Sequence, residues 1–573
     1  MRDNELKPAR MKRHFLPDDL IITRWEDVQP WFDDLQERDI RKTEEMERWL
    51  TDRSELAFVL EEELAWRYIR MNCHTDNKEY AALFETFVSE IEPEISRWSD
   101  KLDEKFLSHP LSSQLDREKY KVLLRTVKNR HDLFREENVP LKAELEVLEQ
   151  EYGKIASQMT VILDGKELTL QQASNYLKEP ERALRKKAFL KITQRRLEDA
   201  ETLQKLFTTL IEKRSVVAHN AGFDNYRDYR FAELGRFDYN VSDCEEFHES
   251  IRQTVIPLVE EMHTRRRELM KTDKLRPYDL KHDPLGRPPL KPFNEVKELV
   301  EKTSEAFSRV NPLFGALLRA MNRKGYLDLD SRKNKAPGGF NYPLYESNLP
   351  FIYMNATGNL RDVETLFHEG GHAIHSWLSR EIRLIEYKEL PSEVAELASM
   401  SMELISMDQW DVFFPDRNDL LRAKKEQLEG IIHILPWIAA IDKFQHWLYT
   451  HPGHSHEERN NAWMKLMKDF SSSLIDWSGF EKYQGLSWQT QLHLFEVPFY
   501  YIEYGIAQLG AIAIWKNYRS DPEKTIRQYM DALSLGYSHP IPEIYKAAGI
   551  RFDFSLSYVR ELIFFLKNEL ERL

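Results

Sequence analysis

Apolar residues recur three and four positions apart along most of the chain, which is the spacing of one face of an α-helix. The pattern is clearest from about Ile40 to Gln150, in segments such as SELAFVLEEELAWRYIRM at 54–71. Residues 181–222 continue it without a break and predict one long helix that acts as a spine. Residues 1–35, with Pro17 and Pro30, are expected to be extended.

Short interruptions of the helical pattern predict turns and strands. The segment LDGKELTLQQASNYL at 163–177 reads as a hairpin followed by a helix. Residues 274–294 hold five prolines and predict a loop, and a second irregular region covers 330–339. Leu349–Asn355 is aromatic and β-branched, which is typical of a strand. The pattern therefore predicts a mainly α protein with one small sheet near the middle.

Composition and charge narrow the function classes. The net charge of −14 argues against a nucleic-acid-binding protein. Because the chain has no apolar run near the length of a membrane span, and no apolar segment follows its basic start, we expect a cytoplasmic protein without membrane contact. Cys73 and Cys244 are too few for a disulfide framework or a cysteine-ligated metal site and are expected to be ordinary reduced thiols.

The most informative segment is VETLFHEGGHAIHSWL at 363–378, which contains His368-Glu369-Gly370-Gly371-His372. Positions i and i+4 of a helix lie on one face, so the two imidazoles can converge on one metal ion. Glu369 between them can act as the general base on a water beside the metal. This is the zincin arrangement.

The neighbours of the motif support this interpretation. Two adjacent glycines cost a helix about 1 kcal/mol each relative to alanine, so we expect another chain segment to pass close to Gly370 and Gly371. His375 lies about 10 Å along the helix from His368 at 1.5 Å per residue. It is therefore too distant to share the ion and is expected to support the site from outside the metal shell or to be structural.

The third ligand must come from elsewhere, and the next predicted helix, LPSEVAELASMSMELIS, offers three carboxylates on one face. Its neighbours are too apolar for a solvated acidic face. We favour Glu396 as the ligand, with Glu403 orienting a histidine, and keep Glu393 as the alternative ligand.

HEGGHAIH followed by ELASMSME resembles the M3 metallopeptidases: thimet oligopeptidase, oligoendopeptidase F and, most closely, the bacterial Pz-peptidases. The resemblance implies that Glu396, 28 residues after His368, is the third zinc ligand, and that Glu403 is the supporting carboxylate. It covers the chain from about residue 180 with specific motifs. The first 180 residues agree only in helical character.

Two further segments look like parts of the same family. KAPGGFNYPLYESNLPFIYMN resembles its glycine-containing loop and edge strand, which implies that Gly338, Gly339 and the strand around Phe351–Asn355, with Tyr353, bind the substrate backbone. In LHLFEVPFYYIEYGIAQLG the resemblance implies that His493 and Tyr504 donate hydrogen bonds to the scissile carbonyl, and that Tyr501 lies beside the substrate. Which of these tyrosines, Tyr500 included, touches the transition state stays open.

The resulting prediction is a two-lobed helical zincin with a small sheet beside the HExxH helix and a deep groove between the lobes. An N-terminal lobe would span 1–180 and a catalytic domain 181–573. One Zn²⁺ per chain would serve the cleavage of internal bonds in short, unfolded peptides. The alternatives are a zinc carboxypeptidase or dipeptidyl carboxypeptidase of similar build and, in another class, a non-catalytic helical scaffold.

Overall fold

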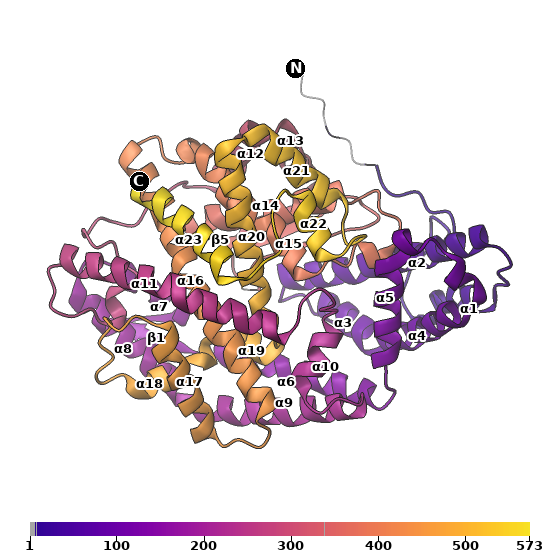
Figure 1. The fold of residues 1–573 in the computed structure, drawn as a ribbon, viewed down its shortest axis with the longest axis horizontal. Coiled ribbons are helices and arrows are strands. Elements are labelled where there is room, and N and C mark those ends of the chain that lie inside the picture. Colours follow the sequence, from indigo (N-terminus) through magenta and orange to yellow (C-terminus); the bar gives the residue numbers. More distant parts are fainter. Residues whose placement is uncertain (1–5, 7–8, 337) are drawn as a thin grey trace. The chain divides into compact units, whose positions relative to one another are not determined.

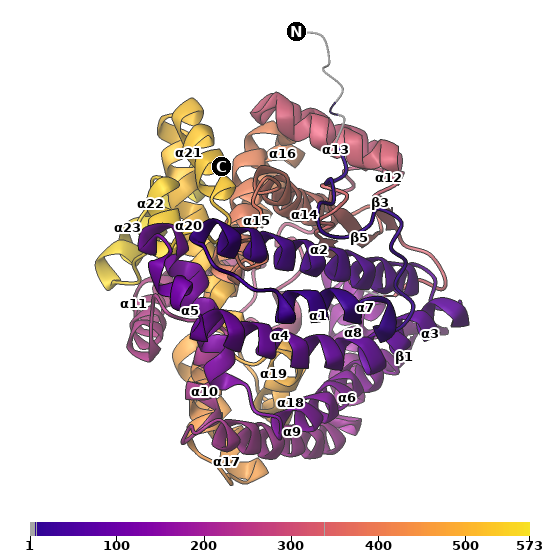
Figure 2. The same ribbon diagram turned by 90° about the vertical axis from the view of Figure 1, so that its right-hand side faces the viewer.

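The computed structural model describes residue 6 and residues 9–336 and 338–573. The fold is mainly helical, as predicted, and it contains a three-stranded sheet and a two-stranded sheet (Figures 1 and 2). The chain divides into two compact units, each made of three segments. The first unit holds 1–134, 291–423 and 507–552, and the second holds 135–290, 424–506 and 553–573.

The first unit combines N-terminal, central and C-terminal elements. These are α1 (Gln29–Glu37), α2 (Thr43–Cys73), α3 (Lys78–Thr86), α4 (Glu92–Ser108), α5 (Arg117–Leu133), α12 (Val296–Val310), α13 (Pro312–Lys324), β3 (Leu327–Asp330), β4 (Phe340–Tyr342), β5 (Phe351–Ala356), α14 (Leu360–Leu378), α15 (Ser392–Ser406), α21 (Pro522–Ser534) and α22 (Ile541–Ala547). Helices α16 (Arg417–Thr450) and α20 (Tyr501–Ser520) contribute residues to both units.

The small sheet of the first unit packs against α2, and its strands β4 and β5 also contact α14. Its strand order is β3-β5-β4, with β5 parallel to β3 and antiparallel to β4. Ala65 and Ile69 of α2 pack with Phe351 and Tyr353 of β5 in one hydrophobic cluster. Because α14 follows β5 directly, this packing fixes the start of the helix that carries the two motif histidines.

The second unit consists of helices and one hairpin. Its elements are α6 (Asn138–Ser157), β1 (Thr160–Leu163), β2 (Lys166–Thr169), α7 (Leu170–Asn175), α8 (Arg182–Glu198), α9 (Ala200–Asn220), α10 (Tyr226–Glu233), α11 (Val241–Leu269), α17 (His456–Phe470), α18 (Glu481–Leu486), α19 (Leu492–Glu496) and α23 (Leu556–Glu571).

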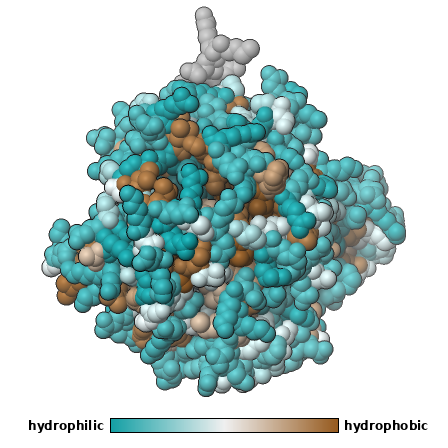
Figure 3. Space-filling view, turned by 60° about the vertical axis from the view of Figure 1, so that its left-hand side comes forward, coloured by the Kyte–Doolittle hydropathy of each residue, from teal (hydrophilic) through white to brown (hydrophobic). Residues whose placement is uncertain are grey.

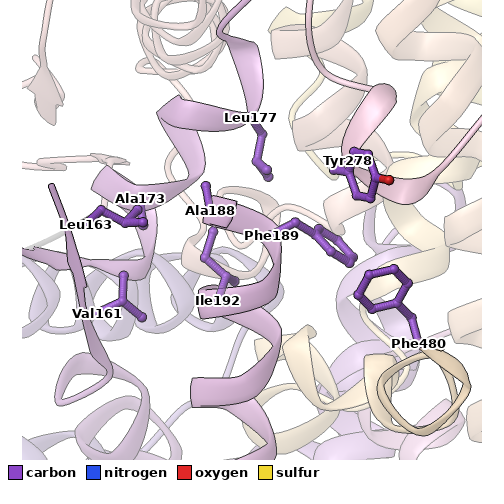
Figure 4. Packing of buried hydrophobic residues seen from close by; sticks show 9 residues of the cluster. All are labelled: Val161, Leu163, Ala173, Leu177, Ala188, Phe189, Ile192, Tyr278 and Phe480. Atoms are coloured by element: carbon purple, nitrogen blue, oxygen red, sulfur yellow. The ribbon is translucent and has the colours of Figure 1, made fainter. Parts of the chain in front are cut away.

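The predicted hairpin and following helix are confirmed as β1, β2 and α7, and they form part of a hydrophobic cluster. Figure 4 shows Val161 and Leu163 of β1 on one side of the α8 side chains and Phe480 on the other. Phe189 of α8 meets Phe480 edge to face, with ring centroids 5.0 Å apart. The cluster joins segments that are about 300 residues apart in the chain.

Two expectations about helices are corrected. Residues 181–222 form two helices, α8 and α9, because Asp199 adopts a non-helical ψ of 0° between them. Its short side chain, hydrogen-bonded to Arg195, competes with helix continuation. Residues 29–37 form α1 rather than an extended segment, since Pro30 lies in the first turn, where its missing N–H costs nothing. The predicted division at residue 180 stays a prediction.

Among the described residues no helix combines the length and the apolar character needed to cross a bilayer. On the face drawn in Figure 3, hydrophobic residues form small groups among hydrophilic ones.

Candidate active site

Helix α14 begins at a capping box. The Asn359 side chain accepts a hydrogen bond from the Asp362 N–H, and the Asp362 carboxylate accepts from the Asn359 N–H. This fixes the helix start, and His368 and His372 follow one turn apart on one face. Their ring centroids lie 4.9 Å apart.

The adjacent glycines allow two close contacts, as predicted. A Cβ atom on Gly371 would lie 2.5 Å from the Cα of Ser399 on α15, and one on Gly370 would lie 2.5 Å from the Phe307 ring of α12. Because Ser399 meets Gly371 through backbone atoms, no side-chain rotation could relieve that clash. Gly371 therefore allows the close approach of α14 and α15, and Gly370 allows that of α14 and α12.

This approach brings three donor groups together. His368 Nε2 lies 3.2 Å and His372 Nε2 3.7 Å from Glu396 Oε2. All three donor atoms fall within 4.8 Å of one another. Two imidazoles and one carboxylate form the ligand set of a catalytic zinc site, so these residues fit the metal that the motif predicts.

A second layer of contacts orients these groups. Glu403 Oε1 lies 2.6 Å from His368 Nδ1, and the Ser399 hydroxyl donates to Glu396 Oε2 at 3.1 Å. The histidine side chains are 20% and 18% exposed, whereas Glu396 is 7% exposed. The imidazoles therefore stay open to a ligand. The role of Ser399 was not predicted, because its spacing gave no signal beyond that of a small residue.

The electrostatics hold two of the three donor groups in the form that binds a metal. Burial lowers the pKa of His372 to about 4. Burial would raise the pKa of Glu396, but His372 and His368 lower it to about 2. Burial would also lower the pKa of His368, yet its hydrogen bonds to Glu396 and Glu403 raise it well above the usual value. At neutral pH, Glu396 is charged and His372 neutral, the forms in which they bind a metal, and His368 releases a proton when it does so.

Glu369 lies in the same helix turn and is buried. Burial raises its pKa to about 7, against the opposing influence of His368. A carboxyl group with a pKa near neutrality can both accept and return a proton. Asn341 of β4 donates from its side chain to the Glu369 carbonyl at 3.2 Å, which ties this turn to the sheet.

Two neighbouring residues lie outside the donor group. Glu393 is buried but is not among the residues that converge with the histidines, so the geometry favours Glu396 of the two predicted alternatives. His375 is buried, and neither ring nitrogen has a hydrogen-bond partner in the described part of the chain. Burial lowers its pKa to about 3, which keeps the ring neutral.

The prediction that Phe351–Asn355 forms an edge strand is wrong. Strand β5 lies in the middle of its sheet, with Tyr353 opposite Asp328 on one side and Phe340 on the other. Its backbone groups are therefore used within the sheet. The Tyr353 ring is 1% exposed and stacks on Phe340 at 4.6 Å, so this side chain belongs to the core. The strands that have a neighbour on only one side within this sheet are β3 and β4.

The glycine-containing loop is attached to this sheet. Asn355 donates from its side chain to the carbonyls of Ala336 and Gly338, at 2.9 and 3.0 Å. Gly338 has φ +110°, which a residue with a side chain rarely adopts. Gly339 lies so near β5 that a Cβ would be 3.3 Å from the Tyr353 carbonyl. Substrate binding by Gly338 and Gly339 stays a prediction.

The remaining predicted residues cluster in the second unit. The His493 ring centroid lies 4.9 Å from that of Tyr501 and 5.8 Å from that of Tyr504. Gln491 donates to His493 Nδ1 at 2.7 Å and accepts from Trp437 Nε1 at 2.9 Å, which leaves the His493 Nε2 as the N–H donor. Gln491 was not singled out in the sequence because a lone glutamine carries no motif.

Comparison with known proteins gives the family context. A family model described as Peptidase family M3 matches residues 175–563, and one described as Peptidase M3 N-terminal domain matches residues 19–134. Among solved structures, Pz peptidase A with an inhibitor is 26% identical at a TM-score of 0.88, covering 95% of this chain and 96% of that one. An oligoendopeptidase F structure is 26% identical at 0.89, covering 96% and 97%.

Curated relatives agree over shorter stretches. Oligopeptidase PepF of Bacillus subtilis (strain 168) is 24% identical over 67% of this chain and 56% of its own length. The chromosomal oligoendopeptidase F of Lactococcus lactis subsp. cremoris is 25% identical over 56% and 52%. The chain thus spans little more than half the length of these curated relatives.

Proposed function

The chain belongs to peptidase family M3, and on this premise we propose that it is a zinc-dependent oligoendopeptidase acting on short, unfolded peptides. The observation that carries the proposal is the convergence of His368, His372 and Glu396 within 4.8 Å, beside a buried Glu369. A zinc ion held by these three residues would supply Lewis-acid polarisation of a water and of the scissile carbonyl.

Glu369 acts as general base and then as general acid. Its carboxylate takes a proton from the attacking water, and the protonated group later gives that proton to the leaving amine. Burial supports both steps, because it raises the pKa of Glu369 to about 7. Glu403 holds His368 by its Nδ1, so that Nε2 stays directed to the ion site.

His493 and Tyr504 stabilise the developing oxyanion. The hydroxyl of Tyr504 and the Nε2–H of His493 are hydrogen-bond donors of the kind that a tetrahedral oxyanion needs. Their clustering within the second unit, and the Gln491 hydrogen bond that sets the His493 tautomer, support this assignment. Tyr501 lines the same cluster, with its pKa raised to about 12 by burial, and stays protonated.

The substrate class follows from the relatives. Two of them are named oligopeptidase and oligoendopeptidase, which fits short peptides cut at internal bonds. Binding would use the backbone of an extended peptide. The free side of β4, next to the Glu369 turn, is a better candidate for that pairing than β5.

Cleavage of an internally quenched peptide of about ten residues, blocked at both ends, tests the proposal. We expect internal cleavage that disappears after chelation and returns with zinc. A protein that leaves this peptide intact but trims an unblocked one is an exopeptidase. Absence of turnover on both peptides, with zinc bound, would favour the scaffold alternative.

A further inference from the structure

A second cluster of metal-ligating side chains lies in the second unit, on two helices that the proposed reaction does not use. Cys244 and His248 are four residues apart on α11, and Asp442 and His446 are four residues apart on α16. Residues with this spacing share one helix face. Two such faces meet here, and the donor atoms of Cys244, Asp442 and His446 all lie within 4.8 Å of one another.

The cluster is sealed from solvent. Asp442 and His248 are fully buried, and Cys244 is 1% exposed. The His446 ring is covered by Phe231 and Phe499, with ring centroids 5.7 and 5.4 Å away. A thiol, a carboxylate and imidazoles are seldom gathered in such a dry place without a bound ion or a complete hydrogen-bond network.

The hydrogen-bond network within the cluster is incomplete. His248 Nε2 and His446 Nε2 both lie near Asp442 Oδ2, at 2.8 and 3.1 Å. The other carboxylate oxygen, Oδ1, has no hydrogen-bond partner within the described residues, although it is buried. The Nδ1 atoms of His248 and His446 are likewise buried without a hydrogen-bond partner among the described residues. Each such atom carries a desolvation cost that a metal ion could offset.

From this geometry we propose that Cys244, Asp442 and His446 bind a second Zn²⁺, distinct from the ion held by His368, His372 and Glu396. Sulfur, nitrogen and oxygen donors in one small site suit zinc among the divalent metals. His248 hydrogen-bonds to the Asp442 carboxylate and orients it, as outer partners of metal ligands do. The thiol of Cys244 gives up its proton when the ion binds.

The ion would fasten α11 to α16 and thereby hold the segment that precedes α20. Gln445, next to His446, accepts a hydrogen bond from the Phe499 N–H at 2.5 Å. Phe499 has φ +66°, which is unusual for a phenylalanine, and it directly precedes the tyrosines that begin α20. The second site would therefore support the segment that carries Tyr501 and Tyr504.

The metal content of the purified full chain tests this proposal. After zinc loading and removal of free metal, we expect about two zinc ions per chain, and about one in both Cys244→Ser and the double variant His368→Ala/His372→Ala. Cys73→Ser is the matched control and should keep both ions. Burial and an Asp328 contact raise the pKa of the Cys73 thiol to about 12, so it offers no thiolate.

Cobalt gives a readout that belongs to the second site alone, because the first site contains no sulfur. The native protein loaded with Co²⁺ should show thiolate-to-cobalt absorption in the near ultraviolet. That absorption should vanish in Cys244→Ser and persist in Cys73→Ser and in His368→Ala/His372→Ala. One zinc per native chain without the absorption would overturn the proposal, and so would an absorption unchanged in Cys244→Ser. If a variant fails to fold, the zinc content and the cobalt absorption of the native protein still test the proposal. Neither measurement depends on peptidase activity.

Discussion

Glu403 Oε1 lies 2.6 Å from Nδ1 of His368, on the opposite side of the ring from the nitrogen that faces Glu396. This contact fixes which nitrogen is available to the metal. Glu403→Gln keeps the shape but removes the charge, so we expect zinc affinity to fall about 10- to 100-fold. Competition with a chromophoric chelator measures it.

A control for this change is Glu381→Gln, because the Glu381 side chain is 84% exposed and lies just beyond α14. Its zinc affinity should equal that of the native protein. An unaltered affinity in Glu403→Gln would contradict the role given to Glu403.

Gly371→Ala tests the close approach of α14 and α15. The added Cβ would lie 2.5 Å from the Ser399 Cα, so the helices must separate. We expect a loss of about 1–3 kcal/mol in the free energy of unfolding, as for other overpacked sites, together with weaker zinc binding. Thermal melting and metal titration measure the two effects.

Gly430→Ala is the matched control within a helix, since no atom lies within 4 Å of the added Cβ. It should leave zinc binding unchanged and raise the melting temperature, because alanine favours helix by about 1 kcal/mol over glycine. If Gly371→Ala and Gly430→Ala had the same melting temperature and zinc affinity, the close contact at Gly371 would not be needed for the site.

The HExxH site was predictable because its geometry is mostly local. The spacing of His368 and His372 fixes their shared helix face, and the glycines beside them indicated a close neighbour without naming Ser399. The position of β5 within its sheet was not predictable in this way. A strand's own residues show that it is buried, but they do not show which other segments pair with it on each side, here those of Asp328 and Phe340.

The second metal cluster was missed for a related reason. Cys244 and Asp442 are 198 positions apart, and each helix carries only two of the relevant residues, so neither segment forms a recognisable motif. The break at Asp199 was also hidden, because the apolar pattern continues through it and only the local backbone changes.

Tyr504→Phe tests the proposed oxyanion role. Removing one donor from an oxyanion site typically lowers kcat by about 10²- to 10³-fold. We expect a fall of that order with KM little changed. Tyr518→Phe, on the same helix, should keep native kinetics. A native kcat for Tyr504→Phe would remove this residue from the mechanism.

The stability of the fold should decline in mild acid through His263. This histidine of α11 is 5% exposed, and burial, with the charge of Arg266, lowers its pKa to about 4. The unfolded chain takes up this proton near pH 6.5, so the folded state loses stability as the pH falls from about 6.5 to 4.

His263→Phe removes this proton uptake and keeps a ring against His433, whose centroid lies 5.2 Å away. Between pH 7 and 5 the native protein should lose about 2 kcal/mol more than the variant. Denaturant unfolding at the two pH values measures the difference. If both proteins lost the same free energy of unfolding, His263 would not be the source of the acid sensitivity.

Turnover of the end-blocked peptide by Glu369→Gln, at a measured zinc content, tests the proposed mechanism. We assign the metal to His368, His372 and Glu396, and the proton transfers to Glu369. The variant should therefore bind as much zinc as the native protein, while its turnover falls by at least about 10²-fold. Native turnover by the zinc-loaded variant would contradict the assignment of Glu369 as the base.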